Sequence, residues 1–66
     1  MIIHTVHVPF HGKDKVYRYY WSDICQQWLD VGGVFAHSDE WVKRLESVAP
    51  RMGGYIVLKN AEEDYC

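Results

Sequence analysis

The first part of the chain alternates between two sets of side chains, as a β-strand does. In "IIHTVHVPF", residues 2–10, every second residue falls on the same face, and β-branched residues dominate. The stretch "VYRYYW", residues 16–21, alternates in the same way and has rings on both faces. Residues 11–15 between the two runs are polar and include Gly12, which is typical of a loop of about four or five residues. The pattern predicts a β-hairpin over residues 1–21.

The period of the apolar residues changes after residue 21. In "SDICQQWLDVGG", Ser22 or Asp23 can cap a helix, and a glycine pair ends the segment. At helical spacing, one stripe collects the apolar residues Ile24, Cys25, Trp28 and Leu29. The sequence therefore predicts a first short helix directly after the hairpin.

A second helix is predicted after Ser38, which is the expected N-cap, and it ends at Pro50. Its apolar stripe consists of Trp41, Val42, Leu45 and Val48. "RMGG" then forms a turn, and "YIVLK", residues 55–59, alternates as a third strand. Residues 60–66 are expected to form an acidic tail.

These elements predict a single α+β domain over residues 1–66, in the order β-β-α-α-β. It divides into a hairpin at 1–21, two helices within 22–49, a third strand at 55–59 and a tail at 60–66. The expected architecture is a small three-stranded, mainly antiparallel sheet with two short helices on one face. The alternative is an αα-hairpin beside a sheet that a partner chain completes.

Only one face of such a sheet can be covered by the helices. We expect the covered set to be Tyr17, Tyr19 and Trp21, with Val6 and Val8 beside them. The other face then presents a mixed aromatic, aliphatic and cationic surface with a charged rim in the hairpin loop. Its predicted partner-binding residues are Ile3, His7, Lys13, Lys15, Arg18 and Tyr20. The alternative is ordinary sheet packing, since cross-strand tyrosine pairs also stabilise sheets.

Composition and charge define the kind of partner. Of the 66 residues, 48% are apolar and 24% are charged, as in ordinary globular domains. A chain of this length buries only roughly 60% of its unfolded surface, so its stability is expected to be marginal. Residues 1–21 hold three Lys or Arg and one Asp (+3 − 1 = +2), and residues 22–66 hold four basic and eight acidic residues (+4 − 8 = −4). The hairpin is therefore suited to an acidic partner.

The sequence offers little catalytic chemistry. His4 and His7 point to opposite faces of a strand, so we predict no metal site and no cofactor. Cys25 in a first helical turn, with His37 or His4 as base, is the best nucleophile candidate. A small two-layer domain has little volume for the pocket that such a nucleophile needs. The two glycine pairs lack phosphate-loop spacing. We therefore predict no catalytic residue and no enzymatic activity.

The start of the chain shows no signal-peptide pattern, and no run reaches the ~18 apolar residues of a membrane span. Cys25 and Cys66 do not form a disulfide framework, so free thiols are expected. These features predict no membrane association and a cytoplasmic location, which is the host cytoplasm if the protein is viral.

The function that these features favour is a small non-enzymatic protein-binding module. It would act as an inhibitor or adaptor of the bacteriophage accessory type by occupying a partner's site with its hairpin face. The partner protein is unidentified, and a second copy of the chain, forming a homodimer, is an alternative. The alternative function is binding of single-stranded nucleic acid by the same face. The sequence pI of about 6.0 argues against it.

Overall fold

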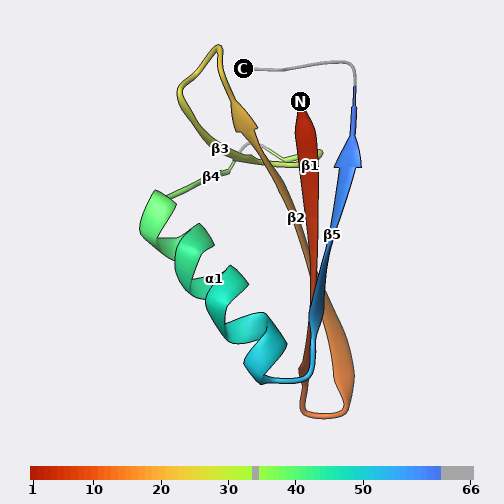
Figure 1. The fold of residues 1–66 in the computed structure, drawn as a ribbon. Coiled ribbons are helices and arrows are strands. Elements are labelled where there is room, and N and C mark those ends of the chain that lie inside the picture. The colour runs from red at the N-terminus through yellow and green to blue at the C-terminus, as the bar shows by residue number, and fades with distance from the viewer. Residues whose placement is uncertain (34, 62–66) are drawn as a thin grey trace.

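An antiparallel sheet packed against one helix forms the protein in this computed structural model, which describes residues 1–33 and 35–61 (Figure 1). The sheet has five strands in the order β4-β3-β2-β1-β5. In chain order the elements are β1 (Ile2–Phe10), β2 (Lys13–Ser22), β3 (Gln27–Asp30), β4 (Ala36–His37), α1 (Asp39–Arg51) and β5 (Tyr55–Asn60). The α+β class is as predicted, but the layout of three strands and two helices is wrong.

The segment predicted as the first helix is a tight turn followed by β3. Gln26 adopts a positive φ of 55° and donates its backbone N–H to the carbonyl of Ser22 at 2.7 Å. This reversal returns the chain beside β2, where Trp28 pairs with Trp21. Trp28 and Leu29 then point to opposite faces of the sheet rather than to one helical stripe. A short apolar run is compatible with both the helical and the strand periodicity. Pairing with the end of β2 makes this segment a strand. Within residues 22–33 and 35–49, the structure therefore has one helix and not two.

The hairpin is confirmed, but its loop is shorter than predicted. Phe10 pairs with Lys13, so only His11 and Gly12 connect β1 to β2. Both have positive φ values, 50° and 74°, as the two central residues of a type I′ turn require. Residues 13–15, expected in the loop, are the first residues of β2.

Both ends of α1 have local signals that the sequence shows. The hydroxyl of Ser38 accepts the backbone N–H of Trp41 at 3.1 Å, which confirms the predicted N-cap. At the other end, Gly53 has a φ of 86°, and the N–H of Gly54 reaches the carbonyl of Ala49 at 2.8 Å. These contacts form a Schellman motif. It ends the helix at Arg51, one residue beyond the predicted end.

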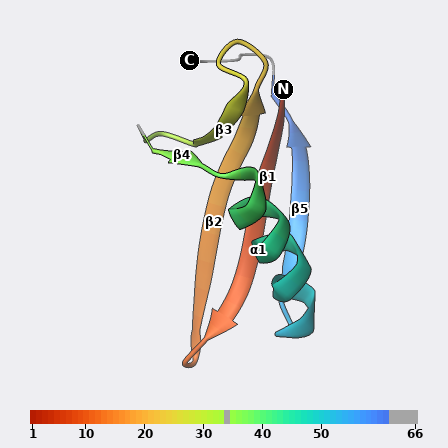
Figure 2. The same ribbon diagram turned by 90° about the vertical axis from the view of Figure 1, so that its left-hand side faces the viewer.

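The core lies between α1 and one face of the sheet (Figure 2). Its buried residues are Val6, Val8, Tyr19, Val42 and Ala49, and partly buried Tyr17, Trp28, Trp41, Leu45 and Ile56 pack against them. The prediction that Tyr17 and Tyr19 pack under a helix with two valines is confirmed. Trp21 shares this face but is 37% exposed. It lies near the end of β2, where its ring contacts Trp28 edge to face.

The third predicted strand exists as β5, which pairs antiparallel with β1. Beyond it, Ala61 still exchanges backbone hydrogen bonds with Met1. The remainder of the predicted acidic tail, residues 62–66, lies outside the described residues. Within the described chain, no helix has the length and apolar character that crossing a membrane requires.

Candidate functional site

The face of the sheet opposite α1 is not covered by any element in the part of the chain that the structure describes (Figure 1). We call it the open face. Strand alternation and the cross-strand registers assign to it Ile3, Thr5, His7, Asp14, Val16, Arg18, Tyr20, Leu29, Tyr55, Val57 and Lys59. The strands β5, β1 and β2 cross it side by side, so residues far apart in sequence form one surface.

The centre of the open face combines exposed apolar side chains with a guanidinium group. Thr5 lies between Arg18 on one neighbouring strand and Val57 on the other. Tyr55, Val57 and Val16 are exposed by 56%, 45% and 43%. So much exposed apolar surface beside an arginine is typical of a protein-binding surface.

The open face carries a net positive charge. Arg18 and Lys59 contribute two positive charges, and the carboxylate of Asp14 is the only acidic group that the described strands add. That carboxylate is engaged, because its Oδ2 lies 3.0 Å from Nδ1 of His7. The ring of His7 in turn stacks on Tyr55 with a centroid distance of 4.3 Å. The two unengaged cations therefore set the sign of the field above this face.

The predicted partner-binding residues do not all reach this surface. Arg18 is exposed on the open face, and Ile3 and His7 are there and half-buried. Tyr20 is on the same face but is only 5% exposed. At this level β2 is an inner strand, and Tyr20 is flanked by Ile3 and Leu29. The ring of Tyr20 therefore offers little surface to a partner.

Lys13 and Lys15 lie on the opposite face from the one predicted. Their cross-strand partners are Phe10 and Val8, which belong to the face that α1 covers. The ammonium of Lys15 lies 5.1 Å from the centroid of the Phe10 ring, a cation–π contact. The cause is the two-residue turn, which places both lysines within β2 rather than in a flexible loop. The predicted lysine rim of the open face is therefore wrong.

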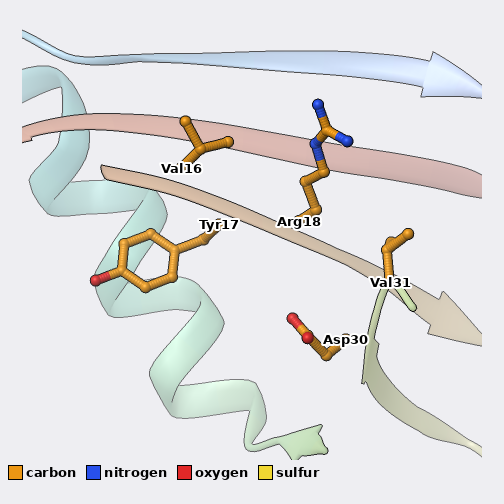
Figure 3. Close-up of a pocket in the computed structure, with 5 residues that line it drawn as sticks. All are labelled: Val16, Tyr17, Arg18, Asp30 and Val31. Atoms are coloured by element: carbon orange, nitrogen blue, oxygen red, sulfur yellow. The ribbon is translucent and has the colours of Figure 1, made fainter. Parts of the chain in front are cut away.

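A pocket of about 380 Å³ opens at the edge of β2, beside Arg18. It forms where the chain leaves β3, because Val31 donates its N–H to the carbonyl of Arg18 and then departs from the sheet. Figure 3 shows Val16 and Arg18 on one side of β2, Tyr17 on the other, and Asp30 and Val31 facing them. The pocket can receive an apolar side chain next to the guanidinium.

The sequence reasoning did not assign to the open face the residues that β5 contributes: Tyr55, Val57 and Lys59. The alternation of "YIVLK" already placed Tyr55 and Val57 on one face of a strand. The missing information was the neighbour of that strand. Pairing with β1 puts Tyr55 beside His7 and Val57 beside Thr5, and thus brings both onto the open face.

A second group of polar side chains lies under α1 and is structural in character. Tyr19, which is fully buried, donates its hydroxyl to Oε2 of Glu46 at 2.8 Å. Burial, together with this acidic partner, raises the pKa of Tyr19 far above its usual value of 10.0. His4 stacks on the Tyr19 ring, and its Nδ1 lies 3.4 Å from the same carboxylate oxygen. The group lies between helix and sheet with His4 and Glu46 partly exposed, and it joins the two layers.

The cysteine and histidine candidates have other partners in the part of the chain that the structure describes. Cys25 is disulfide-bonded in the structure, so the prediction of free thiols is wrong for this residue. Cys66 lies outside the described residues. The ring of His37 stacks on Trp41 at 4.1 Å, and its Nε2 faces Asp30 at 3.5 Å. Among residues 1–33 and 35–61, no three His, Cys, Asp or Glu side chains are placed to share a metal ion.

Comparison with protein-family models, with curated proteins and with solved structures finds no match to this chain.

Proposed function

We propose that the protein is a small non-enzymatic binding module that engages an acidic partner protein through its open face. The observation that carries this proposal is the uncovered row formed by Val57, Thr5 and Arg18 across three strands. Arginine and tyrosine are the residues that most often anchor interfaces, and here both lie beside exposed valines. An inhibitor or adaptor of the bacteriophage accessory type remains the class that we favour.

The acidic character of the partner follows from the charge of this face. Arg18 and Lys59 are exposed, whereas Asp14 is engaged by His7. A carboxylate on the partner can accept a bidentate pair of hydrogen bonds from the guanidinium. An apolar partner side chain can enter the pocket beside it. The face thus offers a charged anchor and an apolar anchor next to each other.

A cytoplasmic location remains a prediction. The argument from free thiols no longer supports it, because disulfides such as that at Cys25 are typical of oxidising compartments.

A photo-crosslinking experiment tests the proposed surface. Benzoylphenylalanine replaces Val16 on the open face or, as a control, Arg44 on the exposed side of α1. In the cells that produce the protein, the Val16 position should yield a discrete protein adduct that the Arg44 position does not. Equal adduct patterns at the two positions, or none at the Val16 position, would contradict the proposal.

The partner identified by crosslinking is then purified without the crosslink. Its affinity for variants of the open face tests whether Arg18 and Tyr55 anchor the interface. Arg18→Ala and Tyr55→Ala should each weaken binding by roughly 30-fold, which corresponds to a loss of about 2 kcal/mol. Arg44→Ala is the matched control and should bind at full strength. Tyr20 is unsuitable for this test because it is buried and its loss would disturb the fold. Unchanged affinity in both open-face variants would overturn the assignment.

A single-stranded oligothymidine probe tests the alternative function. The protein should not bind it at physiological salt. Micromolar binding that weakens steeply with added salt would replace the proposed function with nucleic-acid binding.

A further inference from the structure

The strand β5 forms one edge of the sheet, and no described element pairs with its outer side. It is exposed along most of its length, and Leu58 is the most exposed of its large apolar residues, at 59%. An edge strand with these features is a template for pairing with another strand. Its sequence, "YIVLKN", contains no proline and one charged residue, Lys59. The usual protections against edge pairing are therefore weak here.

The backbone groups that β5 directs outward follow from its contact with β1. Met1 and Ala61 exchange two hydrogen bonds, of 2.8 and 2.9 Å. Hydrogen-bonded and non-hydrogen-bonded pairs alternate along an antiparallel ladder. The register therefore makes Val57 a hydrogen-bonded partner of Thr5. The residues between these pairs direct their N–H and C=O groups away from β1, and they are Ile56, Leu58 and Asn60.

We propose that the protein forms a symmetric dimer in which β5 pairs antiparallel with β5 of a second copy, with the two-fold axis at Leu58. A two-fold axis between antiparallel edge strands is perpendicular to the sheet, so each face continues into the same face of the partner. Paired residues must therefore belong to the same face. In addition, the outward-directed N–H and C=O groups of Ile56, Leu58 and Asn60 must pair with one another. Few registers between the two copies of β5 meet both conditions.

The register centred on Leu58 satisfies the most groups. It pairs Leu58 with Leu58 of the second copy. It also pairs Ile56 with Asn60 of the second copy and, by symmetry, Asn60 with Ile56. These three pairs make about six hydrogen bonds, at two for each pair. Centring on Val57 instead leaves Asn60 unpaired and makes about four. Centring on Lys59 places like charges opposite each other, which is destabilising. In the favoured register Lys59 lies opposite Val57, and the two Leu58 side chains meet on the helix side.

The position of α1 is compatible with this pairing. Only residues 52–54 separate α1 from β5, so the end of the helix is near the beginning of that strand (Figure 2). In an antiparallel pair the two beginnings lie at opposite ends of the seam. The ends of the two helices are thus kept apart, and the region around Leu58 is left for the contact between the copies.

The other edge strand of the sheet is β4, which has only two residues. The part of β2 that extends past the end of β3 is also a weaker candidate. On β2, Val31 already occupies the carbonyl of Arg18, and the free stretch beyond it is short and includes Asp14. A carboxylate on an edge opposes self-pairing. The self-complementary edge is β5, and a second copy of the chain supplies the strand that fits it.

The dimer would place both open faces on one side of a continuous sheet and both helices on the other. This result does not depend on the proposed function, because the oligomeric state can be measured without any other partner. An interface built on one strand is small, and small interfaces are typical of weak, reversible association. We therefore expect a dissociation constant in the micromolar range.

Sedimentation equilibrium from about 1 µM to about 500 µM tests the dimer, because this range brackets weak association. The unmodified chain should shift from monomer to dimer. Leu58→Pro removes an N–H that faces outward, so the pairing with β1 survives and dimerisation should be lost. Leu58→Lys should also abolish the dimer by placing two ammonium groups at the axis. Phe35→Lys, at a 69% exposed position away from β5, is the control and should dimerise normally.

Amide hydrogen exchange provides a second measurement that does not need the proline variant to fold. The N–H groups of Ile56, Leu58 and Asn60 should gain protection as the protein concentration rises, while those of Val57 and Lys59 stay protected throughout. A monomer at every concentration would overturn the proposal. A dimer that persists in both Leu58 variants, with no concentration-dependent protection at Leu58, would also overturn it.

Discussion

The hydroxyl of Tyr19 donates a 2.8 Å hydrogen bond to Oε2 of Glu46 and so joins β2 to α1 across 27 positions of sequence. Tyr19 is fully buried, and its ring also contacts Trp28 and Trp41 edge to face. One side chain thus contributes both apolar packing and a polar link between the layers. Five predictions concern this core and the ends of the helix that covers it.

Replacing Tyr19 with Phe should lower the free energy of unfolding at neutral pH by about 1–3 kcal/mol, because Glu46 loses its hydrogen-bond donor. The variant keeps the ring, so the packing is preserved. Chemical denaturation followed by tryptophan fluorescence measures the difference. Tyr17→Phe, on the same face and half-buried, is the matched control and should change the stability less.

The stability of the parent protein and that of Tyr19→Phe should depend differently on pH in alkaline solution. The folded state holds the pKa of Tyr19 well above its unfolded value of 10.0, so folding favours the protonated phenol. The resulting stabilisation is complete below about pH 10 and is lost as the pH rises through and beyond that value. Between pH 9 and about 11, the parent should therefore lose more stability than Tyr19→Phe. Parallel losses in the two proteins would show that Tyr19 ionises freely in the folded state.

Truncating Trp41 should destabilise the protein by about 3 kcal/mol or more, since large aromatic truncations remove both buried area and packing. Its ring stacks on His37 at 4.1 Å and contacts Tyr17 and Tyr19. Thermal melting of Trp41→Ala followed by circular dichroism checks this. Phe35→Ala is the control, because Phe35 is 69% exposed and its loss should leave the melting temperature nearly unchanged. Equal melting temperatures would mean that Trp41 is not a core residue.

Gly54 should tolerate no side chain. A Cβ atom there would lie 1.9 Å from the carbonyl oxygen of His7, which is backbone and cannot move aside without disturbing β1. Overpacking of this kind costs typically 1–3 kcal/mol and sometimes more. Gly54→Ala should therefore lower the denaturation midpoint more than Gly32→Ala. At Gly32 a Cβ meets nothing within 4 Å, and only the positive φ opposes the substitution.

Ser38→Ala should destabilise α1 by about 1 kcal/mol, because the N–H of Trp41 loses its capping acceptor. Ser47→Ala is the matched control, since Ser47 is exposed within α1 and alanine favours a helix. Denaturation midpoints of the two variants measure the difference. A Ser38 variant as stable as the Ser47 variant would show that the cap contributes nothing.

The features that depend on neighbours along the chain were predictable from the amino-acid sequence. The hairpin follows from alternation, the helix after Ser38 from its cap and stripe, and the strand at 55–59 from its own alternation. The choice of Tyr17 and Tyr19 as covered rings also followed from sequence, because that face brings two valines with it. In each case a local pattern and the local structure agree.

The remaining features depend on pairing between strands that are distant in the sequence. Residues 24–29 fit a helical stripe, but Trp28 gains a cross-strand neighbour in Trp21 only when the segment returns along β2. The open face acquires Tyr55 and Val57 through pairing of β5 with β1, and it loses Tyr20 to burial between Ile3 and Leu29. Strand pairing joins residues that are distant in sequence. Periodicity along one strand defines its two faces, but it does not specify which other strand pairs with it.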